Sequence, residues 1–294
     1  MNWAKTLLGL LLLGCSRTPT PTVTPSPTSA PGRFGQVQSF ACQLQDLDLQ
    51  RVPKVDLFIM DPTQDGSALY SPRQVAQLKQ DGRLLLAYLS IGEAENYRSY
   101  WQKDWKPGHP AWLGPTNPEW GGNYKVHYWD PAWRRIVCKS ALSIQKQGFD
   151  GLFLDVVDGW EFWQKDHPQA QKAMVDLVLE VSRETRRAQA DFGIVLNGGD
   201  GLLGDRPLLE AITGVAKEEI FFGLGGDSKV TPAQFTRECQ KRLRPLVEAR
   251  KLVLSIDYTR DPAQKRAAYE RARQNGYLEF IGARGLDSIP AQAR

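Results

Sequence analysis

The sequence predicts an α/β protein built as a (β/α)8 TIM barrel, and two observations support this prediction. Eight short apolar runs recur between residues 39 and 286, as expected for strands covered on both faces. Amphipathic helical patterns alternate with these runs, which is the order found in parallel sheets. A doubly wound open sheet is the alternative, but no glycine-rich nucleotide-binding loop follows the first run.

The predicted strands and helices follow from apolar periodicity and from helix start signals. The strands are expected at 39–45, 55–62, 84–93, 151–158, 192–199, 212–222, 251–259 and 278–286. The helices are expected at 71–82, 130–148, 167–188, 231–250 and 261–276. Ser71, Asp130 and Asp261 each stand directly before a proline, and this pairing is typical of a helix N-terminus.

Residues 1–15 have the pattern of a lipoprotein-type signal peptide with a lipobox. Lys5 supplies the positive charge, and the apolar core Leu7–Leu13 is shorter than the roughly 20 residues of a membrane span. The end of this core, LLGC, resembles a lipobox, in which Cys15 becomes acylated after cleavage. An ordinary free or buried Cys15 is the alternative. We therefore predict an exported bacterial lipoprotein, anchored at the outer membrane or cell surface and facing the periplasm or the exterior.

Residues 16–35 are rich in Pro, Thr and Ser and predict an extended tether, because such a segment cannot build a core. The barrel is expected over 36–294, with a Trp-rich insertion near 100–133. Three cysteines remain there, an odd number without C-x-x-C spacing: Cys42, Cys138 and Cys239. We expect small buried thiols with at most one disulfide.

Composition and spacing exclude several functional classes. The formal net charge is +4 without a Lys/Arg block, so we expect no nucleic-acid partner. The three histidines, His109, His127 and His167, lack metal-binding spacing, so neither a metal site nor another cofactor is expected. A carboxylate-only Mg²⁺ or Ca²⁺ site is the alternative. The G-x-S-x-G motif of serine hydrolases is absent from the sequence.

Polar side chains gather at the carboxyl ends of the predicted strands. In a barrel these ends meet on one face, where active sites form. Many like charges together cost stability unless they are paired, hydrogen-bonded or protonated, so such clusters indicate functional sites. Arg98 and Arg284 are candidates for part of this pairing. The residues at or near the strand ends are Asp61, Glu93, Glu95, Asp155, Asp158, Asn197, Glu218, Glu219, Asp257, Tyr258 and Arg284.

Eight of the nine tryptophans lie between residues 101 and 163. Paired carboxylates beside aromatic side chains favour glycoside hydrolysis, in which one carboxyl group protonates the leaving oxygen and the other acts as nucleophile or base. Residues 100–133 are too long and too rich in Pro and Gly for a barrel helix, so they predict a structured loop over the mouth. The alternative is that these tryptophans only pack the loop onto the barrel.

Several stretches resemble glycoside hydrolase family 114. They are YLSIGEAENYRSYW (88–101), WGGNYKVHYWDPAW (120–133), GFDGLFLDVVDGW (148–160), GVAKEEIFF (214–222), SIDYT (255–259) and ARGLD (283–287). The resemblance covers about residues 36–290 and implies a (β/α)8 barrel. Characterised members of this family are endo-α-1,4-polygalactosaminidases, so the resemblance also implies a galactosamine-containing polysaccharide as substrate.

The resemblance implies Asp155 as nucleophile and Glu218 as general acid and then base. Asp158 in the same motif and Glu219 beside Glu218 remain open alternatives, although neighbouring strand residues face opposite sides. The substrate-binding candidates are Asp61, Glu93, Glu95, Tyr97, Arg98, Tyr124, Asp158, Asn197, Asp257, Tyr258 and Arg284.

An acidic mouth would attract deacetylated galactosamine units, which are cationic near neutral pH. Two other functions remain open: a barrel that binds an amino-sugar polysaccharide without cutting it, and an α-galactosidase-like hydrolase. The sequence carries no signal for an oligomeric state.

Overall fold

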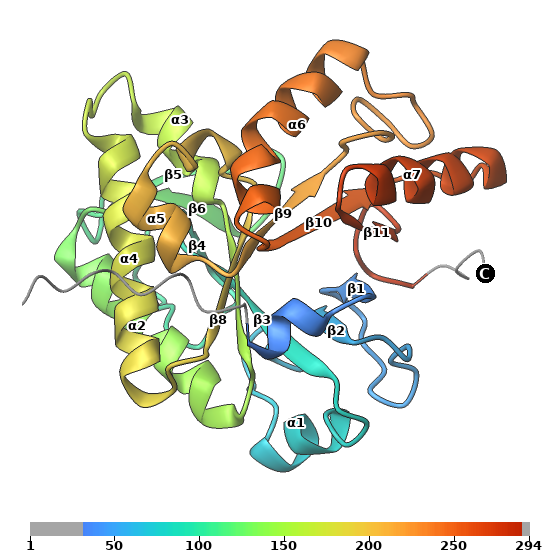
Figure 1. The fold of residues 1–294 in the computed structure, drawn as a ribbon. Coiled ribbons are helices and arrows are strands. Elements are labelled where there is room, and N and C mark those ends of the chain that lie inside the picture. The colour runs from blue at the N-terminus through green and yellow to red at the C-terminus, as the bar shows by residue number, and fades with distance from the viewer. Residues whose placement is uncertain (1–31, 290–294) are drawn as a thin grey trace, which may run out of the picture.

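A computed structural model describes residues 32–289, and its centre is a barrel of eight parallel strands (Figure 1). The strands, in the order in which they neighbour one another, are β1 (Phe40–Gln43), β2 (Leu57–Met60), β3 (Leu84–Ser90), β7 (Gly151–Asp155), β8 (Gly193–Asn197), β9 (Gly214–Glu218), β10 (Leu252–Asp257) and β11 (Leu278–Ile281). Each predicted strand range contains one of these strands, so the (β/α)8 prediction is confirmed.

The barrel is nearly closed, and its seam lies between β1 and β11. Just beyond the two strands, the amides of Leu44 and Gln45 donate to the carbonyl of Leu286 at 2.7 and 3.2 Å. Inside the seam, the rings of Phe40 and Phe280 pack with their centroids 5.8 Å apart. Loop hydrogen bonds and an aromatic contact therefore join the first strand to the last.

Helices surround the strands and begin where the cap–proline pairs predict (Figure 1). They are α1 (Pro72–Leu78), α2 (Pro131–Gln147), α3 (Trp160–Trp163), α4 (Ala170–Ala188), α5 (Arg206–Ala211), α6 (Ala233–Glu248) and α7 (Pro262–Gln274). The side chains of Ser71, Asp130 and Asp261 accept hydrogen bonds from the first turns of α1, α2 and α7. The sequence analysis missed α3 and α5, since four and six residues are too few to show a helical period.

The insertion after β3 forms a three-stranded antiparallel sheet of β4 (Glu93–Glu95), β6 (Asn123–Val126) and β5 (Leu113–Thr116). Four of its tryptophans pack in series, with centroid distances of 5.3, 4.9 and 5.0 Å along Trp101, Trp105, Trp112 and Trp133. The Trp133 indole also donates to the carbonyl of Ile91 at 2.9 Å. All four therefore help to pack the loop onto the barrel, and Trp101 and Trp105 also line a pocket beside it.

The described part of the chain begins just before a short 3-10 turn, Arg33–Gln36. Phe34 is buried and lies so close to Gly193 that a Cβ there would approach its ring to 2.4 Å. The last residues of the expected tether thus belong to the folded barrel. The predicted signal peptide, Cys15 and the rest of the tether lie outside the described residues.

The three cysteines of the described residues are free thiols, with Cys42 and Cys239 buried and Cys138 half-buried. Between residues 32 and 289, none of the helices combines the length and the apolar character that a membrane crossing requires.

Asp150 anchors the amino-terminal side of the barrel. Its carboxylate is 1% exposed and pairs with Arg33 at 2.5 Å and Lys79 at 2.8 Å. The second carboxylate oxygen accepts from the amide of Leu85 at 2.9 Å. One buried carboxylate directly before β7 therefore contacts the first 3-10 turn, the end of α1 and the start of β3.

Replacing Asp150 by Ala should lower the free energy of unfolding by roughly 3 kcal/mol, because it leaves the buried Leu85 amide unsatisfied and removes the carboxylate that Arg33 and Lys79 share. Urea denaturation measures this change. The control is Glu210→Ala, which breaks the exposed Arg206–Glu210 pair (2.8 Å) and should cost less than about 1 kcal/mol. Equal losses in the two variants would contradict the anchoring role.

Candidate active site

Two carboxylates from different strands meet at the carboxyl-terminal mouth of the barrel. Asp155 ends β7, Glu218 ends β9, and Asn197 ends the strand between them. The Asn197 amide donates to Asp155 Oδ1 at 2.9 Å and to Glu218 Oε1 at 3.0 Å. Because both bonds start at one nitrogen, these two oxygens are at most about 6 Å apart, a separation suited to glycoside hydrolysis. Asp155 and Glu218 are called the carboxylate pair below.

Two tyrosines complete the surroundings of the carboxylate pair. The buried Tyr258 hydroxyl donates to Glu218 Oε2, so both oxygens of Glu218 accept a hydrogen bond. The Tyr88 hydroxyl donates to Glu95 Oε1 at 3.2 Å, and it also lies close enough to Asp155 to oppose the rise of its pKa. The sequence analysis missed Tyr88. The alternation of side chains along a strand could have revealed it. Tyr88 lies two residues before Ser90, the residue paired with Asp155, and therefore faces the same side of the strand.

Burial raises the pKa of Asp155 to about 7, against the hydrogen bond from Asn197, and the negative charge of Glu218 adds to the rise. The pair therefore holds one proton close to neutral pH. Burial and the charge of Glu218 also raise the pKa of Tyr258 well above its ordinary value. Tyr258 accordingly remains a hydroxyl that can donate to Glu218.

The backbone turns sharply after each carboxylate. Val156 and Glu219 both adopt the left-handed region, with φ of 56° and 62°. This conformation is costly for residues with a side chain, and most of all for a β-branched one, and it occurs chiefly at functional sites. Gly92 makes the first turn feasible, because a Cβ on it would lie 2.2 Å from the Val156 carbonyl oxygen. The Ile91 amide donates to the carbonyl of Asp155 at 3.0 Å, so the LSIGE and LDVVDG segments support each other.

The structure separates Glu218 from its neighbour Glu219. Glu219 pairs with Arg284 at 2.5 Å, and Arg284 also pairs with Asp227 at 2.8 Å. The Arg284 guanidinium lies over the Tyr258 ring, 4.7 Å from its centroid. Glu219 and Arg284 thus stand beside the carboxylate pair, while Glu218 is the acid that Asn197 joins to Asp155.

Asp158 lies in a 3-10 turn, Val157–Gly159, one step past the strand end. Partial desolvation by surrounding residues raises its pKa, against the positive charges of Lys217 and Lys125, although the side chain keeps contact with solvent. It is exposed at the rim and does not share the Asn197 bridge. The structure therefore places Asp158 beside the pair, where it can contact a ligand.

A second cluster links the ends of β2 and β4 and is called the Arg98 cluster. Arg98 donates to both oxygens of Asp61 at 2.9 and 2.7 Å and pairs with Glu95 at 2.7 Å. Tyr97 donates to Glu95 at 2.7 Å, and Thr63, which the sequence analysis missed, donates to Asp61. Through Tyr88 this cluster reaches Asp155.

Glu93 and Tyr124 have partners within the small sheet. Glu93 is buried and accepts from Lys125 at 2.7 Å and from Asn117 at 3.0 Å. The Tyr124 ring packs on Trp101 with centroids 4.8 Å apart. Glu93 therefore serves to fix the small sheet over the mouth.

Asp257 differs from the expectation that it lines the mouth. Its neighbour Ile256 is in register with Glu218 and shares its face, so Asp257 points to the opposite face, toward the helices. Its side chain is fully buried and accepts from the amide of Phe221 at 3.1 Å. Burial raises its pKa to about 7. The prediction that Asp257 binds substrate is therefore wrong, because its side chain faces away from the mouth.

Within residues 32–289, no three His, Cys, Asp or Glu side chains are arranged to hold a metal ion. The chemistry that the mouth can support with its own groups is proton transfer and nucleophilic attack by carboxylates, with hydrogen bonds from Asn197 and Tyr258.

Comparison with known proteins places this chain among the glycoside hydrolases. A model of glycoside-hydrolase family GH114 matches residues 18–293, nearly the whole chain. The chain belongs to glycoside hydrolase family GH114.

Relatives of similar length occur in distant organisms. An uncharacterized protein of Deinococcus radiodurans is 34% identical over 282 residues, covering 94% of this chain and 90% of its own length. An uncharacterized protein of Methanocaldococcus jannaschii is 33% identical over 270 residues, covering 85% of this chain and 77% of its own length.

Two solved structures share the barrel. The glycoside hydrolase domain of PelA from Pseudomonas aeruginosa superposes with a TM-score of 0.68 at 20% identity, covering 87% of this chain and 98% of that domain. Aspergillus fumigatus Ega3, solved in complex with galactosamine, gives 0.66 at 18% identity, covering 93% and 100% of the two chains. At these identities the likeness supports the fold.

Replacing Gly92 by Ala should lower the free energy of unfolding by roughly 2–4 kcal/mol, because the new methyl group meets backbone at Val156. The control is Gly204→Ala, where a Cβ meets nothing within 4 Å and the change should stay within about 1 kcal/mol. Urea denaturation compares the two variants, and a Gly92 variant as stable as the control would refute the close approach.

Asp155→Asn should stabilise the protein increasingly as pH rises from 4 to 7. The folded-state pKa of about 7 exceeds the ordinary 3.8, so the wild type loses stability across this window as the unfolded carboxyl ionises first. The Tm difference between variant and wild type should then stay constant above pH 7. Asp257 titrates similarly in both proteins and cancels in the difference. A difference independent of pH would contradict the raised pKa.

Proposed function

We propose that the protein hydrolyses an α-1,4-linked, galactosamine-containing polysaccharide through the carboxylate pair. The observation that carries this proposal is the Asn197 bridge, which holds Asp155 and Glu218 within one mouth at a separation that flanks a glycosidic bond. Membership of the GH114 family supports the reaction class, and the resemblance noted above supports the polymer.

Asp155 acts as the nucleophile, and Glu218 acts as the general acid and then as the base that activates water. In the geometry without substrate, Glu218 accepts hydrogen bonds on both oxygens, while the pKa of Asp155 is raised. The shared proton therefore rests on Asp155 before substrate arrives. A cationic amino group near Asp155 lowers its pKa, since an opposite charge favours the carboxylate. Asp155 is then in the carboxylate form that attack on the anomeric carbon requires.

The charge balance of the mouth supports a cationic substrate. The Arg98 cluster holds two carboxylates, Asp61 and Glu95, for one guanidinium. Arg284 likewise faces two carboxylates, Glu219 and Asp227. Both groups therefore remain negative after pairing. An amino-sugar polymer would be attracted to this mouth even though the whole chain is slightly basic.

The separation of the carboxylate pair favours retention of anomeric configuration. Retaining enzymes hold their carboxyl groups about 5–5.5 Å apart, and inverting enzymes about 6.5–9.5 Å apart. The shared bond donor Asn197 limits the nearest oxygens to about 6 Å, below the inverting range. We infer a covalent intermediate on Asp155.

We also propose export and lipid anchoring, from the sequence of residues 1–35 alone. Acylation of Cys15 would hold the enzyme at the outer membrane or cell surface, where a secreted polysaccharide is accessible.

Protein lacking residues 1–31 should release new reducing ends from a deacetylated galactosamine polymer. Asp155→Asn and Glu218→Gln should each lower kcat at least about 1,000-fold, because each removes a group that reacts only in the transition state.

Proton NMR of the first product should show the α-anomer. Added salt should raise KM for the polymer, since the attraction is electrostatic.

Other outcomes identify the competing functions. Polymer binding without product in any variant would mean a binding barrel. Faster turnover of a neutral α-galactoside than of the amino-sugar polymer would mean an α-galactosidase-like enzyme. A β-anomeric first product would refute retention while leaving hydrolysis intact.

A further inference from the structure

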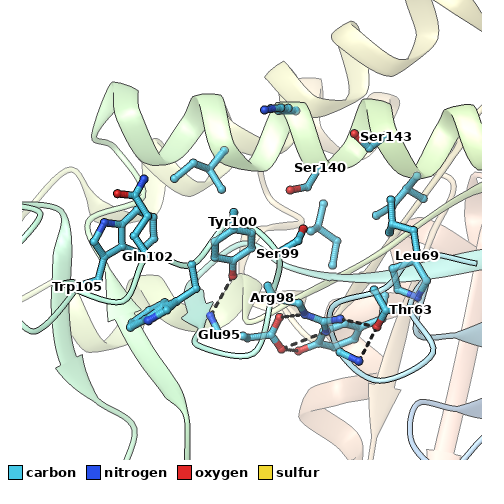
Figure 2. A pocket seen from close by; sticks show the side chains of 18 residues that line it. Thr63, Leu69, Glu95, Arg98, Ser99, Tyr100, Gln102, Trp105, Ser140 and Ser143 are labelled. Carbon is cyan, nitrogen blue, oxygen red and sulfur yellow. Dashed lines mark hydrogen bonds and ion pairs between the residues drawn. The ribbon is translucent and has the colours of Figure 1, made fainter.

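A second pocket of about 490 Å³ lies beside the Arg98 cluster, between α2 and the loop after β4 (Figure 2). Ser140 and Ser143 of α2 stand on one side, and Arg98 with its hydrogen bonds stands on the other. Asp155 and Glu218 do not line it. The volume falls in the range of about 300–1,000 Å³ that is typical of small-molecule sites. This cavity is called the flank pocket below.

The flank pocket is lined by polar side chains without protein partners. Within residues 32–289, the side chains of Ser99, Gln102, Ser140 and Ser143 make no hydrogen bond, and Lys139 makes no ion pair. Four neutral donors and acceptors and one ammonium group are therefore free for a ligand.

An apolar wall faces these polar groups. Trp101, Trp105, Leu69 and Ile136 contribute to it, and Leu69 is 43% exposed at the entrance. Aromatic faces with converging hydroxyl and amide groups suit a pyranose, whose C–H faces are apolar and whose edges are polar. A methyl group, such as that of an acetamido substituent, fits the aliphatic part of the wall.

The Arg98 cluster borders the flank pocket as well as the mouth, and the flank pocket adds a free cation to it. Its carboxylate, Glu95, is already bonded to Arg98, Tyr97 and Tyr88. Lys139 is the one cation of the lining without an ion-pair partner among the described residues. A protonated galactosamine would meet this ammonium group, and like charges disfavour its binding. A neutral sugar meets no such cost.

We infer that the flank pocket is an accessory subsite for a neutral N-acetylhexosamine residue of the polysaccharide. This inference rests on the proposed function and divides the polymer between two sites. The acidic mouth receives deacetylated, cationic units, and the flank pocket receives acetylated units. The flank pocket is lined by Glu95 and Tyr88, and Tyr88 lies on the same strand as Ser90, the residue paired with Asp155, so the two sites are neighbours and one partly acetylated chain can engage both.

The test measures monosaccharide binding in an Asp155→Asn background by isothermal titration and saturation-transfer NMR, with N-acetyl-D-galactosamine and D-galactosamine as probes. Ser143→Trp fills the flank pocket and should weaken N-acetylgalactosamine binding at least about tenfold. Lys139→Glu reverses the free charge and should strengthen galactosamine binding at least about fivefold. Lys241→Glu, at an exposed lysine of α6 outside the flank pocket, is the matched control and should change neither.

Hydrolysis with intact Asp155 gives a second readout. Ser143→Trp should lower kcat/KM severalfold on a partly N-acetylated polymer and leave it unchanged on a fully deacetylated one. Unchanged N-acetylgalactosamine binding in Ser143→Trp, or equal effects of Lys139→Glu and Lys241→Glu, would overturn the subsite. If either of these results occurs while the polymer is still hydrolysed normally, only the subsite inference is refuted. If the pocket binds N-acetylgalactosamine as expected but no polymer is hydrolysed, only the proposed function is refuted.

Discussion

The site depends on one hydrogen-bond donor that serves two acids. Asn197 stands on the strand between those of Asp155 and Glu218, so the parallel order of β7, β8 and β9 alone brings a side-chain amide within reach of both. Burial raises the pKa of Asp155 to about 7 and the nearby charge of Glu218 adds to the rise, so Asp155 retains a proton close to neutral pH. The left-handed residues that follow both acids add backbone strain at the same place. The surrounding barrel has to be rigid enough to hold all three features.

Much of the fold follows from local sequence, because strands buried on both faces and proline-capped helices have strong signals. The strand ends marked Asp155 and Glu218 as candidates, and the family resemblance implied them ahead of Asp158 and Glu219. The orientation of a side chain at a strand end is less accessible. Asp257 was assigned to the mouth, yet the pairing of Ile256 with Glu218 turns it toward the helices. Register between strands is a tertiary property, and a shift of one residue reverses every face.

The role of the tryptophans was open for a similar physical reason. A sequence shows that indole rings are abundant, but the same ring can stack on a sugar or fill a core. The structure uses Trp101, Trp105, Trp112 and Trp133 to fasten the inserted sheet, and Trp120, at 54% exposure, stays accessible at its turn. The flank pocket likewise combines residues from a loop, a small sheet and the outer face of α2, and no contiguous motif could announce it.

The seam between β1 and β11 has a consequence for how the chain folds. Phe40 and Phe280 lie at nearly opposite ends of the folded sequence, so their contact closes a very long loop and is among the entropically most expensive in the barrel. Contacts of such high sequence separation form slowly. Until they form, two strand edges with unpaired amides and carbonyls are open to other chains. During folding these edges are therefore prone to aggregation, and the hydrogen bonds to the Leu286 carbonyl cover them late.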